Sequence, residues 1–440
     1  MKRDFLFTVI SFAFGKGGFL IVSALAANLL AVKEYAYYAL IFTVINLVSG
    51  TIGLAGFTTS NRYYDKKNRQ GLTKYFYGFA LITALSTYIT SNLFLDEHFD
   101  SVSILVLSLC AFLCVVYNYN FGCLYSASKN KAAALINFLL FLILLAFSLA
   151  ASKYGVNWIL YGYFCVFLFG VIISSFLLYS KDNVKIDNLA GTAIKKVTIP
   201  QLLTSLAFLP LISILSIMLL DVDESGQELV IFNVSNQVRM LISFFPMIFS
   251  ALLLSKLTRN EVTFEFDWKA NAALTSLLGF ILFLTLPVII YIFNLEFNQY
   301  NTNVLAFMIS SGIVAALKSP ISRQLIVREQ GITSLFSNLA FGVLFFIFVF
   351  IFSRKELNAL TISFSFFIAQ VLHFLIFYKY FIGLEVLKPA MIKNKHFVYS
   401  CLSLLVSLSI IIMNKALFWI VFLVALLYLV ILFKVLRVGK

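Results

Sequence analysis

Two basic residues draw attention because each lies deep inside a long apolar stretch of the chain. Lys16 falls near the middle of Phe5–Ala31, and Arg239 falls near the middle of Leu229–Leu253. In a helix that rises about 1.5 Å per residue, both positions lie roughly 16 Å from the start of a membrane span, near the midplane. Charged side chains at that depth are costly and usually face a bundle interior or a water-filled cavity. One basic residue comes from each half of the chain at matching depth, so we predict a central, water-filled cavity between two bundles that both residues face. Because Lys and Arg bind phosphate groups well, this cationic cavity is predicted to take an anionic, phosphate-bearing molecule.

Other polar side chains extend this candidate site. Asn236 and Gln237 stand close to Arg239 and add hydrogen-bonding capacity to the same helix. Arg62 and Lys318 lie near the cytoplasmic ends of their predicted spans, where they fit either the inner mouth of a cavity or ordinary anchoring by positive charge. Lys16 could instead bond to backbone carbonyls, because the glycines around it let another backbone approach. The candidate substrate-binding residues are therefore Lys16, Arg62, Asn236, Gln237, Arg239 and Lys318.

Enzyme chemistry and metal binding find little support in the sequence. The acidic run Asp221-Val222-Asp223-Glu224 looks like a metal-binding motif, but it falls in a predicted external loop and fits a solvated loop better. The five cysteines all fall within apolar stretches without the spacing of metal ligands, so no metal site and no cofactor are predicted. His373, midway along a span, could relay protons, although a hydrogen-bonded structural histidine is favoured. No Asp or Glu falls inside a predicted span, which argues against a cation-coupled exporter.

The composition indicates what kind of scaffold must position these residues. Hydrophobic residues make up 61% of the 440 residues and charged residues 12%, against roughly 45–50% and 25% in soluble domains. So few charges cannot cover so much apolar surface, and we predict an all-α polytopic membrane protein. Stretches of about 20 apolar residues are long enough to cross the membrane. About fourteen occur: Phe5–Ala31, Tyr37–Phe57, Tyr75–Leu95, Val102–Gly122, Ala132–Ala151, Trp158–Tyr179, Ile199–Leu220, Leu229–Leu253, Ala272–Phe293, Val304–Ile321, Thr333–Phe352, Leu360–Tyr380, Phe397–Met413 and Leu417–Phe433.

The predicted spans divide into two sets of six and a final pair. A polar stretch separates an N-terminal six-helix bundle (residues 1–180) from a C-terminal one (199–381), with 181–198 as a cytoplasmic linker and 382–440 as an appended two-helix segment. Lys and Arg concentrate in alternate loops, which places both termini in the cytoplasm. The same distribution accounts for the net charge of +14, so binding to nucleic acid is not needed to explain it. A weak match between residues 124–137 and 325–338 favours two related halves.

Three parts of the chain, in their order and position, resemble one family of membrane proteins. The first is the hairpin that runs from Gly15-Lys16-Gly17-Gly18 through Leu29-Leu30 to residues 34–39, and the second runs from Gly53-Leu54 to Arg62-Tyr63. The third runs from Phe232-Asn233 through Asn236, Gln237 and Arg239 to Phe245-Pro246. Together they are similar to the Wzx-type O-antigen and polysaccharide flippases of the multidrug/oligosaccharidyl-lipid/polysaccharide (MOP) exporter superfamily.

The resemblance implies a two-lobed, MATE/MurJ-like bundle in the bacterial inner membrane. Such a protein would move an undecaprenyl-diphosphate-linked oligosaccharide, an O-antigen or related repeat unit, from the inner to the outer leaflet by alternating access. By the same resemblance, Lys16, Arg62 and Arg239 would meet the diphosphate or acidic sugars, and a polysaccharide polymerase and chain-length proteins would be partners. The alternatives are a cation-coupled drug or small-molecule exporter of the same superfamily and a membrane glycosyltransferase or polymerase.

Overall fold

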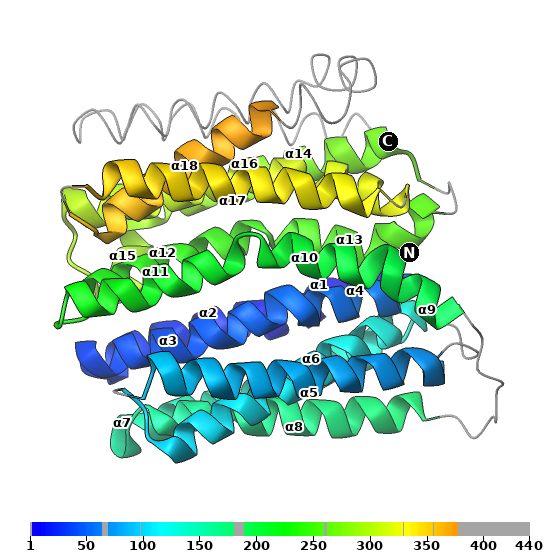
Figure 1. Ribbon diagram of the computed structural model, residues 1–440, viewed down its shortest axis with the longest axis horizontal. Coiled ribbons are helices and arrows are strands. Elements are labelled where there is room, and N and C mark those ends of the chain that lie inside the picture. The colour runs from blue at the N-terminus through cyan, green and yellow to red at the C-terminus, as the bar shows by residue number, and fades with distance from the viewer. Residues whose placement is uncertain are drawn as a thin grey trace.

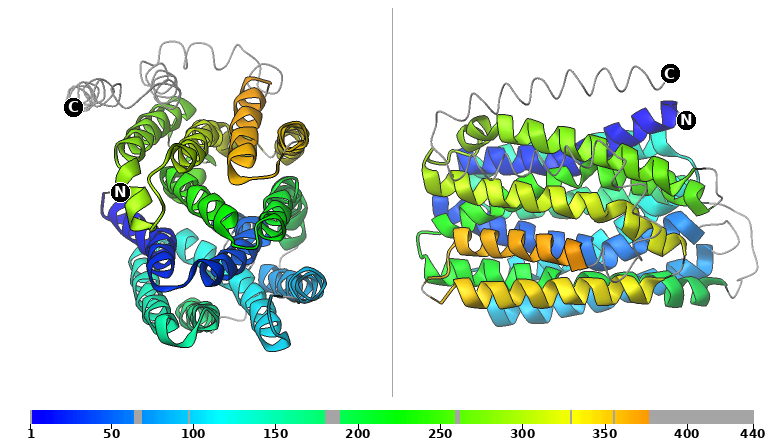
Figure 2. Two further views of the ribbon diagram at one scale, coloured as in Figure 1. Left: turned by 90° about the vertical axis from the view of Figure 1, so that its left-hand side faces the viewer. Right: turned by 90° about the horizontal axis from the view of Figure 1, so that it is seen from above.

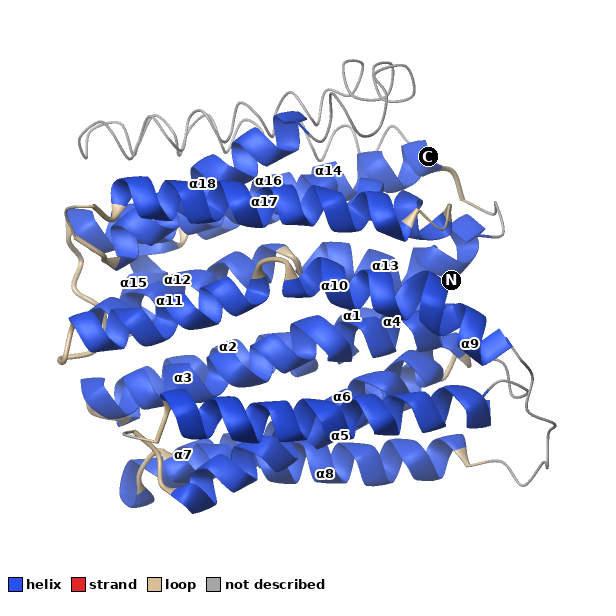
Figure 3. Ribbon diagram, in the orientation of Figure 1, coloured by secondary structure: helices blue, strands red, loops and turns tan. Residues whose placement is uncertain are grey.

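The computed structural model describes residues 2–63, 69–96, 98–179, 189–258, 262–328, 330–354 and 356–376. Within these ranges nearly every residue is helical and no strand occurs (Figure 3). The helices run roughly side by side along one common direction, as expected where backbone groups must be satisfied within each span (Figure 1). The predicted all-α polytopic membrane fold is confirmed. The two last predicted spans, Phe397–Met413 and Leu417–Phe433, and the segment 382–440 lie outside the described residues.

The N-terminal helices build one side of the molecule (Figure 2). The first span joins α1 (Lys2–Phe12) and α2 (Gly18–Leu29) through a π-helical turn, and the second joins α3 (Val32–Val48) and α4 (Leu54–Tyr63) in the same way. Four unbroken helices follow: α5 (Arg69–Phe94), α6 (Ser101–Ser126), α7 (Asn130–Tyr154) and α8 (Asn157–Leu178). Gly122 on α6 lies so close to the backbone of Phe57 that an added Cβ would clash with its carbonyl oxygen, which explains the glycine there.

The C-terminal helices build the other side, and three of their spans are broken next to prolines. The seventh span joins α9 (Leu189–Ala193), a π-helical turn (Ile194–Thr198), α10 (Ile199–Leu206) and α11 (Leu209–Val222). The eighth breaks at Ser243 between α12 (Gln227–Ile242) and α13 (Phe244–Thr258), and the ninth bends by 63° between α14 (Phe264–Leu284) and α15 (Leu286–Ile292). Pro210, Pro246 and Pro287 lie just after these breaks, as expected for a residue that removes a backbone donor. Three helices complete the set: α16 (Gln299–Val327), α17 (Gly331–Phe352) and α18 (Ala359–Ile376).

The positions of the helices follow the predicted spans, with two differences. Nine described helices are long and apolar enough to cross a membrane, or ten if the bent pair α14–α15 is one span. The third and eighth predicted spans are helical but are not among these: α5 is rich in hydroxyl and amide side chains, and the eighth is divided at Ser243. The helix of the seventh span begins at Leu189, inside the stretch predicted as a linker, because Ala193 and Ile194 are buried despite the neighbouring lysines.

Candidate functional site

The two groups of helices, α1–α8 and α9–α18, touch along a seam that runs the length of the molecule. We call the end where the first residues lie the N-terminal face, and the other end the opposite face (Figure 1). At the N-terminal face, Arg62 donates to the carbonyl of Ile326, and the hydroxyls of Thr59 and Thr198 are 2.7 Å apart. Midway along the seam, Gln237 donates to the hydroxyl of Ser23 at 2.7 Å. The seam is therefore in contact at its middle as well as at the N-terminal face.

At the opposite face the seam also holds a cavity. Asn28 at the end of α2 donates to the carbonyl of Ile292 on α15 at 2.6 Å and so joins the two groups of helices. A cavity of about 560 Å³ opens beside this contact. Its lining is mostly apolar and includes none of the six predicted site residues: Ile21, Ala24, Leu25, Asn28, Tyr291, Ile292, Asn294 and Leu295.

Arg239 lies in the last turn of α12 and turns toward the C-terminal helices. Its Nε and Nη2 both donate to the side-chain oxygen of Asn236, at 3.0 and 2.7 Å. The three-residue spacing brings the two side chains together on one helix face. The guanidinium lies 4.8 Å from the centre of the Phe366 ring on α18, a cation–π distance. On its other side, the stem packs so closely on Gly312 of α16 that a larger residue at position 312 would clash.

Lys318 on α16 is bound by two side chains of α18. Its Nζ lies 2.7 Å from the oxygen of Gln370 and 2.7 Å from Nδ1 of His373. The Nε2 of His373 lies in turn 2.7 Å from the hydroxyl of Ser337 on α17. A lysine amine can only donate to Gln370, and a neutral histidine that accepts at Nδ1 carries its proton on Nε2. With Lys318 as an ammonium, which has no acceptor, the contacts fit a neutral imidazole that accepts at Nδ1 and donates from Nε2 to Ser337.

Two aromatic rings connect these two basic groups. The Phe366 ring under Arg239 meets the Phe341 ring edge to face at 5.4 Å, and the Lys318 amine lies 5.5 Å from the Phe341 centroid. Both rings are fully buried. We call the residues that carry this arrangement the cation cluster: Asn236, Arg239, Ser337, Lys318, Phe341, Phe366, Gln370 and His373.

The two basic side chains of the cation cluster, Arg239 and Lys318, have no carboxylate partner in the described part of the chain. The ion pairs between described residues are Lys269–Glu265 and Arg323–Asp267, and neither includes Arg239 or Lys318. A positive charge held inside apolar surroundings without a counter-charge is costly, so this arrangement can attract an anion into the membrane-spanning region.

The structure distributes the six predicted site residues over several places. Arg239, Asn236 and Lys318 lie in the cation cluster, within the C-terminal helices, rather than in a cavity shared by both groups of helices as predicted. Gln237 faces the seam, and Arg62 closes the N-terminal face. The backbone of Lys16 lies in the π-helical turn between α1 and α2, and its side chain is outside the described part. Substrate binding by these six residues stays a prediction.

Sequence reasoning named His373 as a hydrogen-bonded histidine, but it missed Gln370 and Ser337 and did not connect His373 to Lys318. Gln370 and His373 stand one helical turn apart on a predicted span, which is a signal for a shared polar face. That signal does not identify Lys318 as the partner, because the partner lies more than fifty positions away and is set by how α16 packs on α18. Ser337 is one of many serines in spans and gave no signal of its own.

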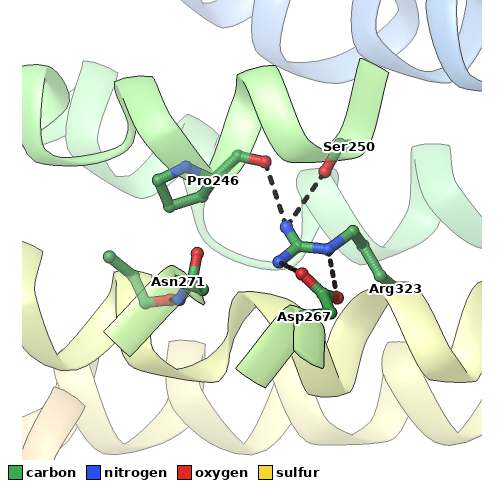
Figure 4. A network of polar contacts seen from close by, with 6 residues as sticks. Pro246, Ser250, Asp267, Asn271 and Arg323 are labelled. Atoms are coloured by element: carbon green, nitrogen blue, oxygen red, sulfur yellow. Dashed lines mark hydrogen bonds and ion pairs between the residues drawn. The ribbon is translucent and has the colours of Figure 1, made fainter. Parts of the chain in front are cut away.

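A buried ion pair lies just before the predicted start of the ninth span. Asp267 is in α14, which begins before the predicted start of that span at Ala272, and is fully buried. Both of its oxygens accept from Arg323 on α16, at 2.8 and 2.7 Å (Figure 4). Arg323 also donates to the carbonyl of Pro246 and the hydroxyl of Ser250 on α13. The pair fastens three helices and neutralises itself, so it leaves no charge free for a cargo ion.

The acidic loop after α11 fastens helices. Asp223 accepts from the backbone and hydroxyl of Ser225 and from the backbone N–H of Glu228. Partial burial opposes ionisation, but these hydrogen bonds outweigh it and hold the pKa of Asp223 below its usual value. Glu228 accepts from the Tyr300 hydroxyl at 2.6 Å and from the N–H of Ala359 at 2.7 Å, which joins α12 to the starts of α16 and α18. Among the described residues, no three His, Cys, Asp or Glu side chains gather as a metal site would require.

The arrangement of helices is similar to that of solved membrane transporters. The lipid II flippase MurJ in an inward closed conformation shares 15% identity at a TM-score of 0.66, over 100% of this chain and 99% of that one. A MOP superfamily transporter from Pyrococcus furiosus shares 14% sequence identity at a TM-score of 0.67, over 92% of this chain and 95% of that chain. Its structure is described as having a binding pocket of reverse polarity. An outward-facing multidrug resistance transporter of the MATE family shares 17% sequence identity at a TM-score of 0.64, over 85% of this chain and 93% of that chain.

These similarities establish the fold, which is the one found in members of the MOP superfamily. No protein-family model and no curated protein matches the sequence.

Proposed function

We propose that this protein is a flippase that moves an anionic, lipid-linked oligosaccharide across the membrane. The observation that carries the proposal is the cation cluster, in which Arg239 and Lys318 lie among membrane-spanning helices and have no carboxylate partner among the residues that the structure describes. A protein that needed these residues only for packing could use apolar side chains at lower cost. The cluster is therefore best explained by a cargo that brings its own negative charge.

A diphosphate is the cargo group that suits the cluster best. Arginine binds phosphate oxygens through two parallel hydrogen bonds, and lysine adds a compact positive charge. The guanidinium of Arg239 uses Nε and Nη2 on Asn236, which leaves its Nη1 for a ligand. We accordingly propose undecaprenyl-diphosphate-linked oligosaccharide, an O-antigen or related repeat unit, as the cargo of a bacterial inner-membrane protein with cytoplasmic termini. A polysaccharide polymerase and chain-length proteins are proposed partners.

Alternating access gives this cargo a route. Polar contacts across the seam include Arg62 with Ile326 and Thr59 with Thr198 at one face, Gln237 with Ser23 at the middle, and Asn28 with Ile292 at the other face. Loss of one set opens that face while the other stays closed. The breaks at Phe208, Ser243 and Thr285 give three spans of the C-terminal group places to bend. A negative-inside potential favours outward movement of an anion by about 2.3 kcal/mol per charge per 100 mV.

Two alternatives have weaker support. A cation-coupled drug exporter needs a carboxylate that is free to bind a cation or drug, whereas the buried Asp267 is already bound by Arg323 at both oxygens. A membrane glycosyltransferase or polymerase would need catalytic acids, and the candidates in the loop after α11 serve as helix-fastening groups.

The loop acids offer a direct test between flippase and enzyme. We expect Asp221→Asn to retain the wild-type rate of translocation, because no described contact of Asp221 reaches the cation cluster. Asp223→Asn should also retain it, with a small loss of thermal stability because the loop loses charge-assisted hydrogen bonds. The rate is measured in reconstituted vesicles. A loss of all activity in Asp221→Asn, with the protein folded, would favour an enzyme.

The proposed function is tested with purified protein in vesicles. Three probes share one short prenyl chain and one sugar but carry a diphosphate diester, a neutral linker or a quaternary ammonium. We expect translocation of the diphosphate probe, faster with the potential negative on the side from which it leaves, and background rates for the other two. Transport of the cationic probe alone would contradict the proposal and favour drug export.

A further inference from the structure

The contacts of Lys318 join one of the two basic groups of the cation cluster to a titratable side chain, His373. In the structure the amine is bound by His373 and Gln370, so it does not point a free ammonium into an open site. When Lys318 is an ammonium, it has donors and no acceptor, so the bond to Nδ1 exists only while that nitrogen is unprotonated. The two side chains therefore hold at most one positive charge between them as long as they stay in contact.

A proton on Nδ1 of His373 changes this arrangement. Two cations whose nitrogens lie 2.7 Å apart repel each other in surroundings of low polarity. The imidazole is fixed from behind by Ser337 and Phe341, whereas the lysine stem is long and only partly buried. Lys318 is consequently the group that moves away. The cost of the added charge falls if an anion is present to receive the freed ammonium.

We propose that His373 is a proton-binding site that releases Lys318 to bind the anionic cargo. This inference rests on the proposed function, because it concerns a proton whose binding is linked to that of the cargo at the same site. One proton comes from the aqueous phase, binds Nδ1 of His373 and breaks the hydrogen bond from Nζ, and the ammonium of Lys318 then pairs with a phosphate oxygen. Cargo and proton bind together, so each raises the affinity for the other.

The other charged groups near Lys318 and His373 do not account for the expected pH dependence of cargo binding. Five helices pack against α16 and α18, and α17 carries no charged or titratable group. The groups on the other four are Glu228 and Arg239 on α12, Lys256 on α13, Glu265, Asp267 and Lys269 on α14, and Tyr291 on α15; the side chain of Lys256 is outside the described part. On α16 itself, Tyr300 and Arg323 accompany Lys318. Asp267 and Arg323 neutralise each other, and Glu228 is bound to Tyr300 and Ala359 at the opposite face. Arg239, the remaining cation of the cluster, is joined to Lys318 through two rings and strengthens the need for an anion.

The first experiment counts protons when an anion binds. A P1,P2-dialkyl diphosphate is the probe, because its two negative charges do not titrate between pH 5 and 8. Calorimetry of the full-length protein in nanodiscs, in two buffers of different protonation enthalpy, gives the number of protons taken up. We expect about one proton per bound probe in the wild type, and an affinity that rises by up to about tenfold per pH unit as the pH falls.

Three variants separate the proposal from a structural role of the histidine. His373→Gln keeps an acceptor for Lys318 but cannot take a proton, so we expect binding without proton uptake and without pH dependence. Lys318→Met should lose affinity together with the pH dependence. The control is His98→Gln, which changes a histidine whose ring lies 5.7 Å from that of Tyr37 at the opposite face, and it should behave as wild type. Proton uptake that persists in His373→Gln, or none in the wild type, would overturn the proposal.

A second measurement needs no ligand, so it distinguishes a failure of the proton site from a failure of the proposed function. The chain has three histidines, and His98→Gln with His396→Gln leaves His373 alone. Nitrogen NMR of labelled protein should show the Nε2–H tautomer, and its titration should move when Lys318 becomes Met. An unchanged titration would overturn the proton site even if transport is confirmed. A changed titration with no probe binding at any pH would instead contradict the anionic cargo.

Discussion

Replacing Asp267 with alanine should destabilise this protein more than any other single exchange considered. The change leaves Arg323, 2% exposed, as a buried charge without its partner. Loss of one member of a buried ion pair costs about 3–5 kcal/mol of unfolding free energy. The effect should extend over α13, α14 and α16, because Arg323 also binds Pro246 and Ser250. Thermal unfolding of the purified protein in detergent, followed by size-exclusion chromatography, measures it.

Two companion variants make this result interpretable. The double exchange Asp267→Leu with Arg323→Met removes both charges and should recover most of the lost stability, because a buried pair can often be replaced by apolar groups at little cost. Glu265→Ala, which breaks the exposed pair with Lys269 on the same helix, is the matched control and should leave the unfolding temperature nearly unchanged. Wild-type stability of Asp267→Ala would show that the pair does not fasten the helices.

The second large effect is expected at Arg239. Arg239→Gln removes the charge and the free Nη1 donor but keeps a side chain that can reach Asn236. A hydrogen bond to a charged group contributes about 1.5–3 kcal/mol, which corresponds to a roughly 10- to 150-fold loss in the translocation rate of the diphosphate probe. Arg239→Lys keeps the charge without the planar donor pair and should lose less.

The control for this prediction is another arginine over a phenylalanine. Arg354 lies 5.6 Å from the Phe350 ring but is exposed at the opposite face, so Arg354→Gln should transport at the wild-type rate. Each variant is compared at equal amounts of inserted, monodisperse protein. Equal losses in Arg239→Gln and Arg354→Gln would mean that surface charge, rather than the cation cluster, governs transport.

The sequence predicted the scaffold better than the site. Apolar length alone placed the described spans, because the membrane fixes how many residues a helix needs. It missed the start of α14, where Glu265, Asp267 and Lys269 interrupt the apolar pattern although Asp267 is buried. A hydropathy scale treats every charged residue as unfavourable in a span. It takes no account of the ion pair through which Arg323, on another helix, neutralises Asp267.

The candidate site shows the same limit. The pairing of Arg239 with Asn236 could be anticipated, because it depends on spacing within one helix. The direction in which Arg239 points could not, since it depends on Gly312 and Phe366 from two distant spans. Depth in the membrane predicted that Arg239 would face a cavity between the two bundles, whereas its side chain lies within the C-terminal helices. The role of Lys16 rests on the sequence alone.

The central claim, that the cation cluster binds a phosphate-bearing anion, is tested most directly by measuring that binding itself. The dialkyl diphosphate probe is titrated into wild-type protein and into the double variant Arg239→Gln with Lys318→Met, both in nanodiscs at one pH near 6.5. We predict saturable binding of one probe to the wild type and an affinity at least about a hundredfold weaker in the double variant. Equal affinity in both proteins would contradict the claim.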